Sequence, residues 1–221
     1  MTDLTGTLYF NEKGLLPSQL QGLLFNHNMP VTVAVSALPQ HTTFLKGHTE
    51  VEIDKLFESL HIATPKALSG AAHVHAILRL PSGEGAVNQL KIKTDLAGVQ
   101  IDYPPYLHKK AKESQSLDIT TSFLPEGAHM KAQYQDLLTV EHSEKGIWTA
   151  KAHLPLVFGQ VSYNPSTRVL TGDLEKWILS DNRSSNWSLK PSDLPAMVMN
   201  IHHLQYGELR LGDLSFKAKS G

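Results

Sequence analysis

The stretch Gln89–Lys112, QLKIKTDLAGVQIDYPPYLHKKAK, decides the fold class of this chain. Its first residues alternate between apolar and polar side chains, which is the period of a β-strand with one buried face. Past Ala97-Gly98 the apolar positions change parity, which predicts a β-bulge: one extra residue that re-aims the side chains that follow. Pro104-Pro105 then stops the strand, because neither proline has an N–H to donate to a neighbour. The stretch therefore predicts a long bent strand that ends in a proline corner.

A cationic run follows the prolines. Lys109, Lys110 and Lys112 lie close together, with His108 beside them. We interpret them as a basic lip at the end of the strand, and as candidates to meet the phosphates of lipid headgroups. The alternative is an ordinary solvated loop, since charged residues in loops are most often simply exposed.

The same stretch resembles a motif of the YhdP-type proteins in the AsmA-like group, where a strand of the form S-D-L-x-G-V-x-L-x-L-P-x-P-L-x-K recurs. The positions that fit are Thr94-Asp95-Leu96, Gly98-Val99, Pro104 and Lys109, whereas the second proline is displaced to Pro105.

Other segments resemble the same family in the same order along the chain. The opening Gly6–Val33 is similar to its repeated strand–turn unit. Val169–Trp177 is similar to its L-x-G-x-L-x-x-L-x-x-x-W segment, with a shorter gap before the tryptophan. Leu194–Leu204 and Leu209–Phe216 resemble the strand pair that follows, so the resemblance covers almost the whole chain.

The resemblance implies a periplasmic, groove-shaped protein that conducts phospholipid between the inner and outer membranes and supports the outer-membrane barrier. It also implies that the chain is an excised fragment of a longer protein that is tethered to the inner membrane. The implied partners are phospholipid acyl chains, neighbouring strands of the full-length protein, and proteins of the two membranes. No cofactor is implied.

Strand-like segments at short intervals, separated by turns that carry glycine, predict one mainly β, antiparallel segment over residues 1–221. The one predicted helix is Glu50–Leu60, with Thr49 as N-cap, and we expect it to cover an end or edge of the sheet. Asp181–Asn186 is the most polar stretch and the best candidate for a flexible loop. Periodicity does not distinguish a barrel, a sandwich and an open sheet. The resemblance favours a long curved sheet, open like a gutter, with an apolar concave face.

The composition excludes several classes of protein. Lys and Arg number 20 against 21 Asp and Glu, which argues against nucleic acid as a partner, because phosphate binding needs a clustered positive excess. The absence of cysteine excludes disulfides, thiolate catalysis and cysteine-based zinc sites. No apolar run approaches the roughly 20 residues that span a bilayer, so no membrane span is expected in this fragment.

Two histidine pairs raise the possibility of a metal site. His73 and His75 point to one face of a strand, whereas the adjacent His202 and His203 point to opposite faces. Since neither motif contains an aspartate or glutamate, we interpret them as solvent-facing polar residues. The sequence has no G-x-S-x-G elbow and no phosphate-binding loop, so no catalytic residue is assigned and an enzyme is not expected. The sequence leaves open whether two carboxylates form a catalytic pair, because such a pair is defined by the distance between the two groups in space.

Apolar residues at alternating positions are the candidates to line a lipid groove. They are Val31, Val33, Val35, Val74, Leu78, Leu90, Ile92, Leu154, Leu156 and Phe158. In most β proteins such faces form a sealed core, whereas a groove leaves one face uncovered. The alternative function is therefore a closed β domain that serves as a structural spacer or protein-binding module of the cell envelope without lipid cargo. Ile92→Asp is expected to reduce lipid loading if the central strand faces the groove.

Overall fold

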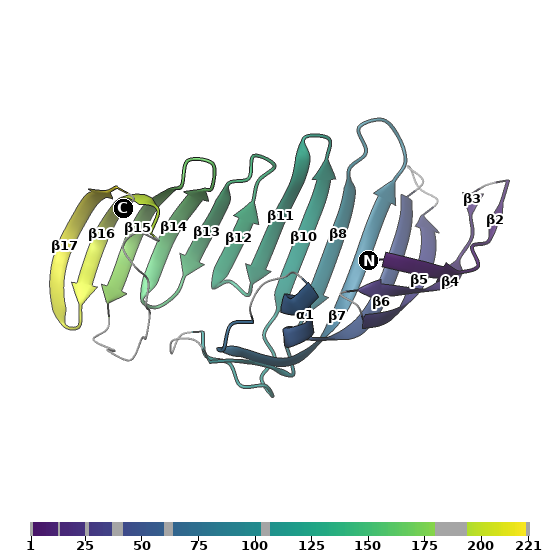
Figure 1. Ribbon diagram of the computed structural model, residues 1–221, viewed down its shortest axis with the longest axis horizontal. Helices are drawn as coiled ribbons and strands as arrows, with labels where there is room; N and C mark the ends of the chain where they lie inside the picture. Colours follow the sequence, from purple (N-terminus) through teal and green to yellow (C-terminus); the bar gives the residue numbers. More distant parts are fainter. Residues whose placement is uncertain are drawn as a thin grey trace. The chain divides into compact units, whose positions relative to one another are not determined.

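The computed structural model describes residues 2–12, 14–24, 27–36, 42–59, 64–102, 107–179 and 194–219. This part of the chain is mostly β-strand with one short helix (Figure 1). It divides into two compact units, residues 1–135 and 136–221. The predicted Pro104-Pro105 corner and the predicted Asp181–Asn186 loop lie outside the described residues.

Unit 1 is built on one open, antiparallel sheet. Its strands are β1 (Thr2–Gly6), β4 (Ser18–Leu24), β5 (His27–Ser36), β6 (Thr42–Glu52), β7 (Leu68–Pro81), β8 (Asn88–Thr94), β10 (Leu117–Leu124) and β11 (Gly127–Tyr134), hydrogen-bonded in that order. Two short strands, β2 (Phe10–Asn11) and β3 (Gly14–Leu15), form a separate hairpin. β9 (Val99–Ile101) pairs with the first residues of β7.

The predicted change of parity in the central stretch is confirmed, but it is produced by a turn at residues 95–98 and not by a β-bulge within a strand. β8 and β9 both pair with β7, with Lys93 opposite His75 and Val99 opposite Gly70. The chain therefore advances six positions where β7 advances five, and the extra residue changes the parity, as the sequence indicated. The stretch is two strands around a turn, however, and not one continuous bent strand.

The helix α1 spans Ile53–Ser59, so it begins later than predicted. Thr49 is not its N-cap, because β6 continues through Glu52 and stays paired with β7 up to Ala71. The helix packs through Ile53 and its partly buried neighbours onto the apolar face of the sheet. β6 and β7 are interior strands, so the helix covers part of a face and not an edge.

Unit 2 contains the strands β12 (Leu138–His142), β13 (Trp148–His153), β14 (Val157–Asn164), β15 (Val169–Leu179), β16 (Ala196–Tyr206) and β17 (Leu209–Ala218), hydrogen-bonded in that order. All neighbours are antiparallel except β15 and β16, which are parallel. The sequence did not indicate this parallel pair.

The predicted mainly β, open fold with one short helix is confirmed. In each unit the two outermost strands do not pair with each other, so its strands do not close into a barrel. The alternative of a closed β domain is therefore wrong. Among the described residues, no helix has the length and apolar character required to span a membrane.

Gly98 gives a direct test of the turn between β8 and β9. Its φ is +96°, and a Cβ there would lie 2.3 Å from the carbonyl oxygen of Ala71. Gly98→Ala is expected to lower the free energy of unfolding by about 2–4 kcal/mol, because strain and overlap with backbone add up. The matched control is Gly83→Ala, where φ is +117° but nothing lies within 4 Å of the added Cβ. Equal losses of unfolding free energy for the two variants in urea would contradict a role for the close approach of Gly98 to the carbonyl oxygen of Ala71.

Candidate functional site

The apolar side chains of unit 2 share one face of its strands. Strand register places the apolar side chains of all six strands there, including Val161, Leu170, Leu174, Met197, Met199, Ile201 and Phe216. No helix or second sheet occurs among residues 136–179 and 194–219 of this unit. The face is buried at its centre on β15 and β16, where Leu174 and Ile201 are 5% and 2% exposed, whereas Trp148 and Leu214 on the flanking strands are 41% and 39% exposed. The result is a wide apolar surface that is partly exposed on both sides of a buried centre.

One glycine determines how this face is filled. A Cβ on Gly172 would lie 2.4 Å from the terminal methyl carbon of Met199. Without a side chain at this position, Met199 lies flat across the neighbouring strand and is 5% exposed. The flexible thioether thereby fills the space between strands with an adaptable apolar surface.

Unit 1 presents the opposite situation, because part of its apolar face is covered. Val31, Val33, Val51, Ala72 and Val74 form one buried cluster with Ile53 of α1 and with Leu96 and Val99 of the turn after β8. The cover thus consists of α1 and of the turn whose sequence carries the family motif.

A buried lysine holds this turn in place. The side chain of Lys109 is 0% exposed, and its Nζ donates hydrogen bonds to the carbonyl oxygens of Leu96 (2.7 Å), Val99 (2.8 Å) and Lys110 (3.2 Å). The backbone of Lys109 also exchanges two hydrogen bonds with Ile101, both 2.9 Å long. We call residues 95–102 and 107–112 the Lys109 loop.

The short polar residues of the motif complete the same turn. Thr94 Oγ1 accepts a hydrogen bond from the backbone N–H of Leu96, and Asp95 Oδ1 accepts one from Ala97. The bond from Ala97 lowers the pKa of Asp95. Leu96 itself has a positive φ of 52°, a conformation that apolar residues rarely adopt, and it is buried. The hydrogen bonds on both sides of Leu96 hold it in this conformation.

The candidate groove residues of unit 1 fall into two groups. Val31 and Val33 are each 1% exposed and Val74 is 7% exposed, so the prediction that they line an open groove is wrong: they belong to the buried cluster that includes Ile53, Leu96 and Val99. Leu78, Leu90 and Ile92 share the apolar face and are half-buried. The side chain of Val35 lies outside the described part of the chain.

The three candidates of unit 2 do not continue the apolar face of β13. Leu154 and Leu156 lie in the turn between β13 and β14, which is closed by hydrogen bonds in both directions between Leu154 and Val157. This turn ends the alternation, so Phe158 pairs with His153 and lies on the opposite, polar face. Its assignment to the apolar face is therefore wrong.

The prediction of a basic lip is wrong for one of its three lysines. Lys109 is not exposed, because its ammonium group is used to hold the turn. Lys110 and Lys112 are exposed, so a contact with headgroup phosphates remains a prediction for these two residues.

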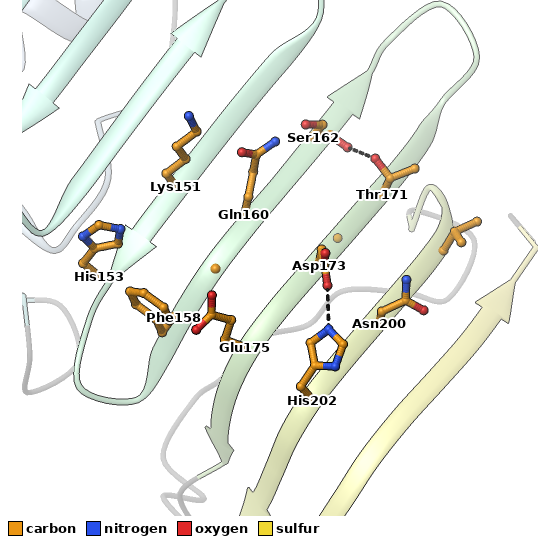
Figure 2. A pocket seen from close by; sticks show the side chains of 13 residues that line it. Lys151, His153, Phe158, Gln160, Ser162, Thr171, Asp173, Glu175, Asn200 and His202 are labelled. Carbon is orange, nitrogen blue, oxygen red and sulfur yellow. Dashed lines mark hydrogen bonds and ion pairs between the residues drawn. The ribbon is translucent and has the colours of Figure 1, made fainter.

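The polar face of unit 2 carries a depression of about 630 Å³ (Figure 2). Its side chains come from β13, β14, β15 and β16, and Figure 2 shows them on one face of the sheet. Asp173 Oδ1 and His202 Nε2 lie 3.1 Å apart across the parallel strand pair. Sequence reasoning missed this grouping, because it depends on two bulges that alternation alone does not predict.

The histidines form no preformed metal site in the described residues. His75 faces His48 across β6 and β7, with ring centroids 6.1 Å apart, and His73 faces Glu50. No group of three metal-ligating side chains in the described chain is arranged to hold an ion. Glu50 does supply a carboxylate next to His73, which the sequence motif lacked. These groups are not arranged to coordinate an ion.

These features define a class: an open, amphipathic β-sheet protein with one face left apolar. Comparison with known proteins gives the family. The chain belongs to the YhdP protein family, whose description, YhdP protein, matches residues 1–152. This membership is consistent with a lipid-transport protein of the cell envelope. No curated protein and no solved structure gives a significant match.

Replacement of Lys109 tests the Lys109 loop. Lys109→Met is expected to lower the free energy of unfolding by about 1–3 kcal/mol, because the carbonyl groups lose a buried donor. The exposed Lys110→Met is the matched control and is expected to change stability by less than about 0.5 kcal/mol. Equal stability of the two variants in urea unfolding at pH 7 would contradict the role of Lys109.

The same two variants give a pH test. Burial lowers the pKa of Lys109, against an opposing effect of Glu113 and Asp95, so the unfolded chain binds this proton more tightly than the folded chain. The contribution of Lys109 to the unfolding free energy therefore rises with pH between the lowered pKa of the folded chain and the usual value of 10.5. Below this pH window the contribution is constant. The unfolding free energy of Lys110→Met minus that of Lys109→Met should increase across the window. The difference removes the contribution of Tyr134, whose pKa is raised by burial.

Proposed function

We propose that this chain forms part of a periplasmic hydrophobic surface along which phospholipid moves between the inner and outer membranes, in support of the outer-membrane barrier. In this proposal the full-length protein is tethered to the inner membrane. The partly exposed apolar face of unit 2 carries the proposal, and membership in the YhdP family supports it. A sealed structural module has no reason to leave such a face open to water.

The physical driving force is the hydrophobic effect. Acyl chains that cover the apolar face gain roughly 25 cal/mol for each Å² of apolar area removed from water. Because this attraction has no preferred direction, it does not hold a chain at one position along the strands. A surface of this kind binds lipid tails and still lets them slide. No covalent chemistry is involved.

The polar headgroups stay in water in this proposal. Charged groups are costly to bury without partners, so a phosphate remains outside the apolar surface. Lys110 and Lys112 are exposed cations that can contact such phosphates. The covered region beneath α1 and the Lys109 loop does not take part, since its side chains already pack against each other.

Val161 is the probe for the apolar face of unit 2. Ile92 packs against the buried cluster of unit 1 and Val161 against that of unit 2, so either Asp variant needs a check of its folding. Val161 lies on the apolar face of β14, and Gln160 lies next to it on the polar face. Val161→Asp places a charge where tails would lie, whereas Gln160→Asp places the same charge on the other side of the same strand.

The experiment is lipid extraction and mass spectrometry of the protein after expression in a bacterial periplasm and purification without detergent. Wild type and Gln160→Asp are expected to carry phospholipid, and Val161→Asp to carry at least about fivefold less while retaining its β circular dichroism spectrum. Folded, lipid-free wild type that also ignores hydrophobic dyes would overturn the proposal. It would leave an envelope protein-binding module as the better interpretation.

A further inference from the structure

Two neighbouring bulges shape the polar face of unit 2. Between β14 and β15 the register skips Glu175, and between β16 and β17 one extra residue lies in the segment His202-His203. The parallel pair β15 and β16 keeps its register across both sites, with Leu174 opposite Ile201 and Trp177 opposite Leu204. The two bulges therefore lie side by side.

The bulges bring additional polar side chains to one face. Leu174 and Trp177 both remain on the apolar face, so the two residues between them, Glu175 and Lys176, both turn to the polar face. His202 and His203 do the same on β16, although adjacent strand residues ordinarily point apart. Both line a second depression that adjoins the first one at Phe158, Glu175 and His202. Bulges of this kind commonly occur beside binding sites, where they re-aim side chains.

The groups in this depression are mixed donors and acceptors. Asp173 and Glu175 accept hydrogen bonds, Lys151 donates them, and the amides of Gln160 and Asn200 do both. Figure 2 shows these side chains around the Asp173–His202 pair. A ligand that fits has to offer many hydroxyl or amide groups, each able to donate and accept.

The depression also contains a flat ring. Phe158 packs against His153, with ring centroids 4.9 Å apart, at the lower end of the cluster in Figure 2. Leu154 and Pro155 extend the apolar surface beside it. Aromatic faces of this type pack well against the C–H groups of a ligand that is polar around its rim.

The depression carries groups of both charges. Asp173 and Glu175 are carboxylates and Lys151 is an ammonium group, while Lys176 lies in an adjoining depression. A strongly anionic or cationic ligand would meet groups of its own sign. An acyl chain would leave the polar groups without partners, which is costly.

We propose that this depression is a binding site for a neutral oligosaccharide, with Phe158 as the stacking surface and Asp173, Glu175, Gln160 and Asn200 as hydrogen-bond partners for sugar hydroxyl and amide groups. A volume of about 630 Å³ is within the usual range for small-ligand sites. This site lies on the face of the sheet opposite the proposed lipid surface and does not depend on that function.

The test is titration of the ¹⁵N-labelled protein with chitotetraose, maltotetraose and cellotetraose, followed by amide chemical shifts. At least one oligosaccharide is expected to bind with a dissociation constant on the order of 1 mM, as suits an open site, and to shift amides of β13–β16. Phe158→Ala is expected to weaken binding about tenfold and Asp173→Asn about threefold.

Tyr163→Ala is the matched control, because Tyr163 is an aromatic residue of the same strand on the apolar face. It should leave saccharide affinity unchanged, as should Val161→Asp. No shift at 10 mM of any of the three sugars would overturn the proposal. Equal loss in Phe158→Ala and Tyr163→Ala, or shifts confined to other strands, would also overturn it. None of these results alters the lipid-extraction experiment, so the two proposals fail separately.

Discussion

The side-chain alternation of a β-strand is the constraint on which this structure depends. In a single-layered sheet, apolar residues gather on one face only while every strand keeps its register, and a slip of one residue moves a whole set of side chains to the other face. Extra residues are therefore tolerated only at defined places. The extra residue before Val99 lies in a turn, where the chain leaves the ladder and returns to it. The bulges at Glu175 and His202-His203 lie next to each other, so that the strands resume a common register.

The Lys109 loop shows how a covered region is made from a sheet that has no second layer. A lysine ammonium is expensive to bury, yet here it is surrounded by three carbonyl oxygens. These bonds hold Leu96 and Val99 against the core valines, as the positive φ values of Leu96 and Gly98 require. The motif residues thus have a local structural role. Thr94, Asp95 and Gly98 form the turn, and Lys109 stabilises it through hydrogen bonds.

The two faces of unit 2 differ in chemistry and in the kind of ligand that they suit. The apolar face attracts by area and without direction, which favours a surface on which lipid tails move. The polar face carries a balanced set of donors, acceptors and a ring pair, which favours a ligand held by directional bonds. A single sheet presents both because successive residues point to opposite sides.

The sequence by itself determined the mainly β class, the parity change at Gly98, and the apolar alternation of β7 and β8, since these depend only on local period. It located a helix near residue 53 but placed its start too early, because pairing of β6 with β7 extends the strand. Only the tertiary structure decided which valines are covered, that Lys109 is buried, and that Phe158 lies on the polar face. Those outcomes depend on a turn, two bulges and one parallel pair, which bring together residues far apart in the chain and leave no periodic signal in it.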